Sequence, residues 1–285
     1  MRWPYLTPLL AALGVWVYGP LVATVVLSLT EWDLGFDEAR FVGLANYGRL
    51  FTEPEFPNAL GRTGLYVVGL LPFATVVPMA LAIRLWKRPG RASDAYRALL
   101  VLPITLAPLA TAVSWRFILD PVQGVANAAL GAVGLPQPYW LGDPATALPV
   151  LVVVSASRVV ALHTLLYGAA LAQLDRRALD AARLDGASEG EVTRRLIVPQ
   201  LVPTTVLLAL LCVVLSGQWV FTNIAVLTQG GPDATTDSVY YRLYTYGFVF
   251  FDVGTASAGA VVLTVGLALA FGLRSLVTRR RHAPS

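Results

Sequence analysis

Residues 201–227 read LVPTTVLLALLCVVLSGQWVFTNIAVL, an apolar run that contains no charged residue. A helix of about 20 such residues crosses the hydrocarbon core of a bilayer, where every backbone amide must be satisfied within its own segment. The composition agrees, because 56% of the residues are hydrophobic, 13% are charged and the mean hydropathy is +0.65. A soluble domain carries about 25% charged residues. The sequence therefore predicts an integral membrane protein.

Six apolar runs can be drawn, and we expect an all-α membrane protein with six transmembrane helices. The runs cover residues 6–29, 63–83, 98–115, 145–174, 201–227 and 253–273. The second contains Pro72 and Pro78 and the third contains Pro103 and Pro108, so kinks are expected in both. No polar stretch is long enough to fold separately. The sequence therefore predicts a single membrane domain over residues 1–285.

Basic residues set the expected orientation, because cytoplasmic loops of membrane proteins carry an excess of Lys and Arg. Five of the 21 basic residues fall on one side, and Arg158 falls inside a span. The other fifteen fall on the opposite side: Arg2, Arg84, Lys87, Arg88, Arg91, Arg97, Arg176, Arg177, Arg183, Arg194, Arg195, Arg274 and residues 279–281. Both termini are therefore predicted to be cytoplasmic. The first run is longer than the core of a signal peptide, so we expect an uncleaved span.

The net charge of +4 is explained by this topology, and no nucleic-acid partner is expected. Membrane lipid is the expected surrounding of the chain. Cys212 is the single cysteine and lies in an apolar run, so this chain alone forms no disulfide and no thiolate metal site. We also find no internal repeat, which weakens the case for a repeat-built secondary transporter.

The most informative polar stretch is residues 176–199, RRALDAARLDGASEGEVTRRLIVP, between the fourth and fifth spans. Leu179 to Leu184 favours a helix, in which Ala181 and Ala182 present a face small enough for close approach by another surface. Gly186 permits a tight turn. Ser188 followed by Glu191 matches a capping box, which starts a second helix. Pro199 is expected to end this helix–turn–helix where the fifth span begins.

This stretch resembles the cytoplasmic signature of binding-protein-dependent ABC importers, which reads Glu-Ala-Ala, three residues, Gly, nine residues, Ile, two residues and Pro. The matching positions are Asp180, Ala181, Ala182, Asp185, Gly186, Ala187, Leu196 and Pro199, with Asp180 in place of the usual glutamate. In that family the loop forms a coupling helix that docks on the ATPase subunit. The resemblance implies the type I importer permease fold and a multi-pass location in the bacterial cytoplasmic membrane.

Three further phrases are similar to the carbohydrate-uptake class of this family, of the maltose and glycerol-phosphate type. They are residues 41–47 after the first span, residues 115–121 with Gly124 and Asn127 after the third, and residues 227–232 after the fifth. Their order and spacing resemble those of the first of two paired permeases. The resemblance implies a second homologous permease, two ATPase subunits and an external solute-binding protein as partners.

A P-loop needs Gly-Lys followed by Ser or Thr, and the only lysine, Lys87, stands between Trp86 and Arg88. The chain is therefore expected to be non-catalytic and to hold no cofactor. ATP and magnesium are expected on the partner subunits.

Five intramembrane residues are candidates for contact with solute. Arg158 is costly in a bilayer, at about 2.5–3.5 kcal/mol or more, so it should face a cavity or a partner. His163 is more often a packing residue. Gln218 and Asn223 suit sugar hydroxyls but equally suit helix–helix hydrogen bonds, and Trp219 suits either a sugar face or the interfacial aromatic belt.

Other classes of protein remain open at this point. A secondary transporter or channel would need a proton or ion relay, and no Asp or Glu lies inside the spans. An intramembrane enzyme would need a partner for His163, and a membrane scaffold would need neither. Within the importer interpretation, the sequence fits a sugar or sugar-like solute, with glycerol 3-phosphate or glycerophosphodiesters as the alternative.

Overall fold

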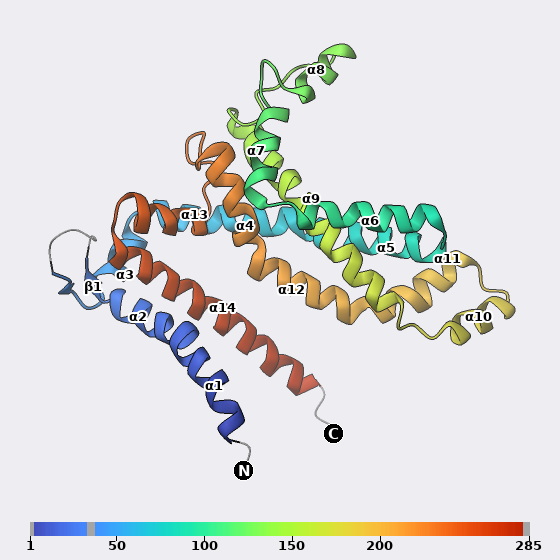
Figure 1. Cartoon of the computed structure of the whole chain (residues 1–285), viewed down its shortest axis with the longest axis horizontal. Coiled ribbons are helices and arrows are strands. Elements are labelled where there is room, and N and C mark those ends of the chain that lie inside the picture. The colour runs from blue at the N-terminus through green and yellow to red at the C-terminus, as the bar shows by residue number, and fades with distance from the viewer. Residues whose placement is uncertain (1–2, 33–37, 282–285) are drawn as a thin grey trace. The chain divides into compact units, whose positions relative to one another are not determined.

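The computed structural model describes residues 3–32 and 38–281, and the chain is mostly helical (Figure 1). Arg2, which the predicted topology places on the cytoplasmic side, lies outside the described residues. Within them, five helices are long and apolar enough to cross a membrane, over Leu6–Leu27, Glu55–Lys87, Pro144–Leu171, Glu189–Thr228 and Val253–Ala270. A bent pair, Arg91–Thr105 with Pro108–Ile118, is the sixth candidate. The six predicted runs thus correspond to five spans and one broken helix.

The chain folds into two compact units, and the first contains residues 1–60 and 239–285. It begins with α1 (Trp3–Leu13), the π-helical turn η1 (Gly14–Tyr18) and α2 (Gly19–Leu27), followed by an antiparallel pair of two-residue strands, β1 (Thr30–Glu31) and β2 (Arg40–Phe41). Next comes α3 (Ala45–Thr52); α13 (Val239–Tyr244), η4 (Thr245–Val249) and α14 (Val253–Arg281) complete the unit. In Figure 1, α2 lies alongside α14.

The second unit covers residues 61–238 and holds the candidate site. Its membrane helices are α4 (Glu55–Ala74, which begins in the first unit), α5 (Val76–Lys87), α6 (Arg91–Thr105), α7 (Pro108–Ile118), α9 (Pro144–Leu171) and α12 (Val198–Asn223). Between them lie α8 (Val125–Ala132), α10 (Arg176–Leu184), α11 (Glu189–Val192) and the π-helical turns η2 (Thr193–Ile197) and η3 (Ile224–Thr228). Helix α9 is central, since α5, α6 and α12 all pack against it. Two hydrogen bonds fix α9 to α12, from Tyr167 to Thr205 (2.9 Å) and from Asn223 to Ser155 (2.8 Å).

The third predicted span, residues 98–115, is not one straight helix, because α6 and α7 meet at an angle of 99°. Ala107 between them is extended, with φ −59° and ψ 131°. A residue before proline is driven out of the helical region, and Pro108 also has no N–H to donate. The expected kink is therefore confirmed as a sharp break.

The expectation that Pro199 ends the cytoplasmic motif is wrong, because Glu189–Thr228 is one continuous helical element of 40 residues. Pro199 lies in the first turn of α12, directly after η2, where a π-helical bond runs from the Val198 N–H to the Thr193 carbonyl. Proline is tolerated in such a first turn. The second half of this loop and the fifth span are thus parts of one rod. We call residues 176–199 the docking loop, after the role that the resemblance implies.

The polar residues of two recognised phrases fix loops outside the spans. Asn46 donates to the carbonyls of Ser28 (3.0 Å) and Thr30 (2.8 Å), where the first span ends. Asn127 donates to the carbonyls of Pro121 (3.1 Å) and Pro138 (3.2 Å) and accepts a bond from the Trp140 indole (2.8 Å). These residues are therefore explained by the stability of the loops in which they stand.

Candidate functional site

The stretch after α9 folds as the predicted helix, turn and second helix. Asp175 caps the start of α10 by accepting from the Arg177 N–H (2.9 Å). Gly186 has a φ of +88°, and the Ala187 N–H bonds to the Ala182 carbonyl (3.0 Å), which closes α10 as a Schellman motif. The predicted capping box is confirmed, because Ser188 and Glu191 bond each other's backbone N–H.

One face of α10 is buried and the other is exposed, and Ala181 and Ala182 lie on different faces. Leu179 is buried, and Ala182 and Ala187 pack with it against a core that includes Tyr167 and Leu171 of α9. Ala181 is exposed on the opposite side. Ala182 therefore supports the loop from within, and only Ala181 belongs to the face that another protein could reach.

The exposed face of α10 contains two residues that were not among the predicted positions, Arg177 and Leu184. Leu184 is 89% exposed, and it shares this face with three other exposed residues: Arg177, Asp180 and Ala181. Spacings of three, four and seven residues place them on one side of a helix. The same spacing could have identified Leu184 from the sequence, because it places this leucine among charged residues on one side of the helix.

A polar clamp holds the docking loop to the end of α5. The Lys87 ammonium donates to the Glu189 carboxylate (2.7 Å), the Glu189 carbonyl (3.1 Å) and the Thr193 hydroxyl (2.6 Å). Arg183 binds Glu189 (2.6 Å) and Asp180 (2.7 Å). Hydrogen bonds from Arg183 and then Lys87 lower the pKa of Glu189 to about 2, so this carboxylate stays ionised at physiological pH. The only lysine thus positions the loop.

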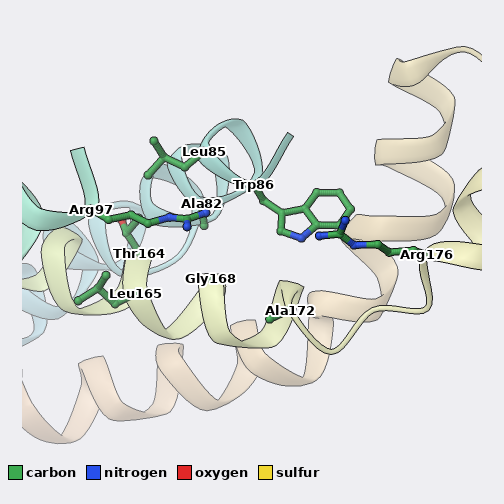
Figure 2. Close-up of a pocket in the computed structure, with 9 residues that line it drawn as sticks. All are labelled: Ala82, Leu85, Trp86, Arg97, Thr164, Leu165, Gly168, Ala172 and Arg176. Atoms are coloured by element: carbon green, nitrogen blue, oxygen red, sulfur yellow. The ribbon is translucent and has the colours of Figure 1, made fainter. Parts of the chain in front are cut away.

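A second tether joins the start of α10 to α5, as Figure 2 shows. The Arg176 guanidinium lies over the ring of Trp86, 5.7 Å from its centroid, which is a cation–π contact. Both residues line a cavity of about 380 Å³ together with Arg97 of α6 and Thr164 of α9. The loop is therefore attached to the membrane helices at both of its ends.

The intramembrane candidates gather in a second place, around Trp219 of α12. Trp219 and Arg158 line both a cavity of about 310 Å³, with Gln218, and a smaller one of about 40 Å³, with Asn223. Gln218 is exposed, Arg158 and Trp219 are half-buried, and Asn223 is buried. The structure therefore brings four of the five predicted solute-pathway residues to one place.

Arg158 is oriented toward backbone rather than toward an acid. Its guanidinium donates to the Ile104 carbonyl at 3.5 Å, the long limit of a hydrogen bond. In a continuous helix that carbonyl would accept from residue 108, which is a proline without an N–H. Arg158 thus partly satisfies the carbonyl that the α6–α7 break leaves free, and its side chain lines both cavities.

His163 has the same kind of partner but no access to the cavities. It is fully buried, and its Nδ1 lies 2.7 Å from the Ala74 carbonyl, so that nitrogen carries the proton and donates. Pro78 stands four residues after Ala74 and has no N–H to offer this carbonyl. The imidazole also packs edge-on to Trp219, with ring centroids 5.8 Å apart. His163 lines neither cavity, but it packs against Trp219, which lines both.

A family model described as the inner membrane component of binding-protein-dependent transport systems matches residues 74–283, which include the docking loop and the Trp219 cluster. The chain belongs to this family. The permease is 33% identical over 276 residues to a probable ABC transporter permease, YurN of Bacillus subtilis, covering 93% of this chain and 91% of the relative. It is 28% identical over 269 residues to the sn-glycerol-3-phosphate permease UgpA of Agrobacterium fabrum, covering 92% and 89%.

Solved structures agree on the fold of the permease. A chain of a bacterial ABC transporter that imports the acidic polysaccharide alginate superposes with a TM-score of 0.85 at 20% identity, covering 99% of this chain and 96% of that one. The resemblance read from the docking loop, the all-α type I permease fold and the multi-pass location in the inner membrane are therefore confirmed. Among the described residues, no three His, Cys, Asp or Glu side chains gather as metal ligands would.

Proposed function

We propose that this permease is one of two paired translocation subunits of an ATP-driven importer for a sugar or sugar-like solute. An external binding protein would deliver the solute, and two ATPase subunits would bind ATP and magnesium and supply the energy. The observation that carries the proposal is the exposed face of α10, held on a buried core by the Lys87–Glu189 clamp and the Trp86–Arg176 contact. A supported helix that presents an apolar side chain among polar ones suits docking into a groove of a partner.

The continuous helix from Glu189 to Thr228 supports a mechanical role. Glu189 at the clamp and Trp219 at the cavities lie on the same rod, about 45 Å apart at 1.5 Å per residue. A displacement of the docking loop by the ATPase would therefore move Gln218, Trp219 and Asn223 without any hinge between them. Alternating exposure of the cavities would follow from such movement.

The chemistry of the cavities supports a polar solute. Trp219 offers a flat apolar surface, and Gln218 offers amide groups for hydroxyls. Arg158 favours a second candidate, glycerol 3-phosphate or a glycerophosphodiester, because a guanidinium pairs well with phosphate. Relatives named as sn-glycerol-3-phosphate permeases support that candidate, and the alginate importer supports an acidic sugar.

The experiment is purification of the tagged permease from its own cells in mild detergent, followed by ATPase assays with the binding protein and candidate solutes. We expect a second permease and an ATPase to copurify, with activity stimulated by one loaded binding protein. Leu184→Asp should abolish ATPase retention, while Ala178→Asp on the flank of the same helix should preserve it. Recovery of the wild-type chain alone would favour a secondary transporter or a scaffold instead.

A further inference from the structure

Another cavity opens between the ends of α5 and α6, away from the Trp219 cluster. Its volume is about 760 Å³. Arg84, Arg88 and Arg91 line it, with Leu81 and Leu85 among its apolar residues. The lining thus combines three arginines with a set of leucines that belong to membrane helices.

The three arginines, Arg84, Arg88 and Arg91, give this cavity an unbalanced positive charge. No acidic residue lines it, and none of the three forms an ion pair within the described part of the chain. The nearby carboxylate of Asp94 pairs instead with Arg97, at 3.6 Å. Guanidinium groups bind phosphate oxygens in a bidentate manner. The chemistry of the rim therefore selects an anion, and a phosphate above all.

The rest of the lining is apolar and continues into the spans. Leu81 and Leu85 come from α5, and Leu99 and Leu100 come from α6. Leu99 is 58% exposed beside Tyr96, which is 62% exposed, and tyrosine is enriched where a membrane meets water. A small soluble anion would leave this apolar wall in contact with water, whereas an acyl chain would cover it.

The turn between the two helices is built to hold the arginines together. The Ser93 hydroxyl donates to the Arg88 carbonyl, and Gly90 has a φ of +148°, which a side chain would strain. Arg88 at the end of α5 and Arg91 at the start of α6 thus face one cavity. The site is preformed by the backbone.

We propose that this cavity binds an anionic phospholipid, with its phosphate between the arginines and its first acyl carbons along the leucines. Basic pockets between membrane helices are the usual sites of such headgroups. The same end of α5 carries Trp86 and Lys87, which hold the docking loop. The lipid therefore anchors the helix end on which that loop is mounted, whatever solute the permease carries.

The test is lipid binding by the full-length permease, purified in detergent and titrated with phosphatidylglycerol or phosphatidylcholine under native mass spectrometry. At about fivefold in affinity per arginine near the headgroup, we expect phosphatidylglycerol to bind on the order of 100-fold more tightly. The triple variant Arg84→Gln, Arg88→Gln, Arg91→Gln should bring the two affinities together. The control Arg177→Gln, Arg194→Gln, Arg195→Gln removes the same charge from the docking loop and should keep the preference.

Three results would overturn the proposal. They are equal binding of the two lipids by the wild type, equal loss of preference in the control variant, or competition by inorganic phosphate at the affinity of the lipid. The last result would identify a site for a free anion. If the triple variant fails to fold, the single variant Arg88→Gln replaces it, with an expected loss of about fivefold in preference. An unchanged preference in that variant would also overturn the proposal.

Discussion

The docking loop and the Trp219 cluster both depend on side chains that donate hydrogen bonds through nitrogen, yet the partners in the two regions differ in charge. In the loop, Lys87 and Arg183 bind the carboxylate of Glu189 at an exposed surface. In the cluster, Arg158 and His163 bind backbone carbonyls of Ile104 and Ala74. The first pattern is stable in water, because water solvates an ionised carboxylate well. The second is suited to a bilayer, where any unsatisfied polar group costs several kcal/mol.

The comparison shows how two prolines of the permease are accommodated. Pro78 and Pro108 each stand four residues after a carbonyl that they cannot satisfy, and α9 supplies a donor to each of those carbonyls. A break in one helix is thus matched by a polar residue in another. The docking loop contains no such pairing, because its turn is closed by its own backbone through Gly186 and Ala187.

The largest expected effect is on the loop, from Gly186→Pro. Proline fixes φ near −65°, whereas Gly186 has a φ of +88°, so α10 could not close in its present form. We expect near-complete loss of solute uptake and of ATPase retention, with the chain still inserted in the membrane. Uptake into cells, copurification of the ATPase and the amount of chain in the membrane fraction measure these outcomes.

Gly190→Ala is the matched control, because Gly190 lies in the first turn of α11, has open space where a Cβ would lie and needs no positive φ. It should leave uptake within about twofold of the wild type, since such a change costs little. Normal uptake by Gly186→Pro would show that the turn at Gly186 is not needed for transport.

The next effect concerns the cluster, where His163→Ala leaves the Ala74 carbonyl without a donor. We expect a loss of about 1–3 kcal/mol in the free energy of unfolding, since an unsatisfied buried group costs about that much. Adding Pro78→Ala should recover much of it, because the new N–H at position 78 can bond to the same carbonyl. Reversible unfolding in mixed detergent micelles gives the four free energies of this double-mutant cycle.

His163→Asn is the control that keeps a donor near the position of Nδ1, and it should be milder than His163→Ala. Additive effects of His163→Ala and Pro78→Ala, to within about 0.5 kcal/mol, would mean that the pairing of histidine with proline is incidental.

The two regions also differ in how much of them the sequence could predict. The turn at Gly186 and the capping box of Ser188 and Glu191 depend on partners three to five residues away, so their pattern was enough. Arg158 and His163 were recognised as unusual, but their partners lie 54 and 89 residues away in the sequence. The prolines indicated kinks without indicating which side chains would satisfy the freed carbonyls.

Helical periodicity explains a further difference within the loop. Leu179 and Ala182 are three residues apart and share the buried face, so Ala182 could have been assigned to the core, and Leu184 to the exposed side. The continuity of α12 through Pro199 was not predictable from the proline alone. A π-helical turn precedes Pro199, and Ile197 and Leu201 on either side of it are buried in the core. Local chemistry thus predicted the motif, and tertiary contacts decided its extent.

A smaller effect is expected for Arg158→Met, because its bond to Ile104 is long and its side chain is only half-buried. The free energy of unfolding should fall by about 0.6 kcal/mol, the average for polar contacts between membrane helices. ATPase stimulation by the loaded binding protein should fall by about tenfold or more if the free guanidinium donors contact solute. Detergent unfolding and ATPase assays in reconstituted vesicles separate the two contributions.

Arg116→Met provides the comparison, since Arg116 also donates to a carbonyl, that of Val226 at 3.3 Å, but lines neither cavity at Trp219. It should leave the stimulated ATPase activity unchanged. Equal losses of stimulation in the two variants would show that Arg158 acts on the fold alone.

The smallest effect is the pH dependence of the clamp. The pKa of Glu189 is lowered from 4.5 to about 2, so its contribution to loop stability is complete above pH 4.5 and is lost as the pH falls toward 2. Hydrogen exchange of the amides of residues 188–197, corrected for the intrinsic rate, should therefore be independent of pH between pH 5 and 8 and should accelerate in acid. Glu189→Gln should accelerate exchange at neutral pH by about threefold, as expected for exposed ion pairs, and should weaken the acid response. Asp185→Asn removes a charge from the adjacent turn and should do neither. A flat acid response in the wild type would mean that the buried side chains Leu179, Val192 and Ile197 hold the loop without help from the clamp, and that the two regions of the permease differ less than their charges indicate.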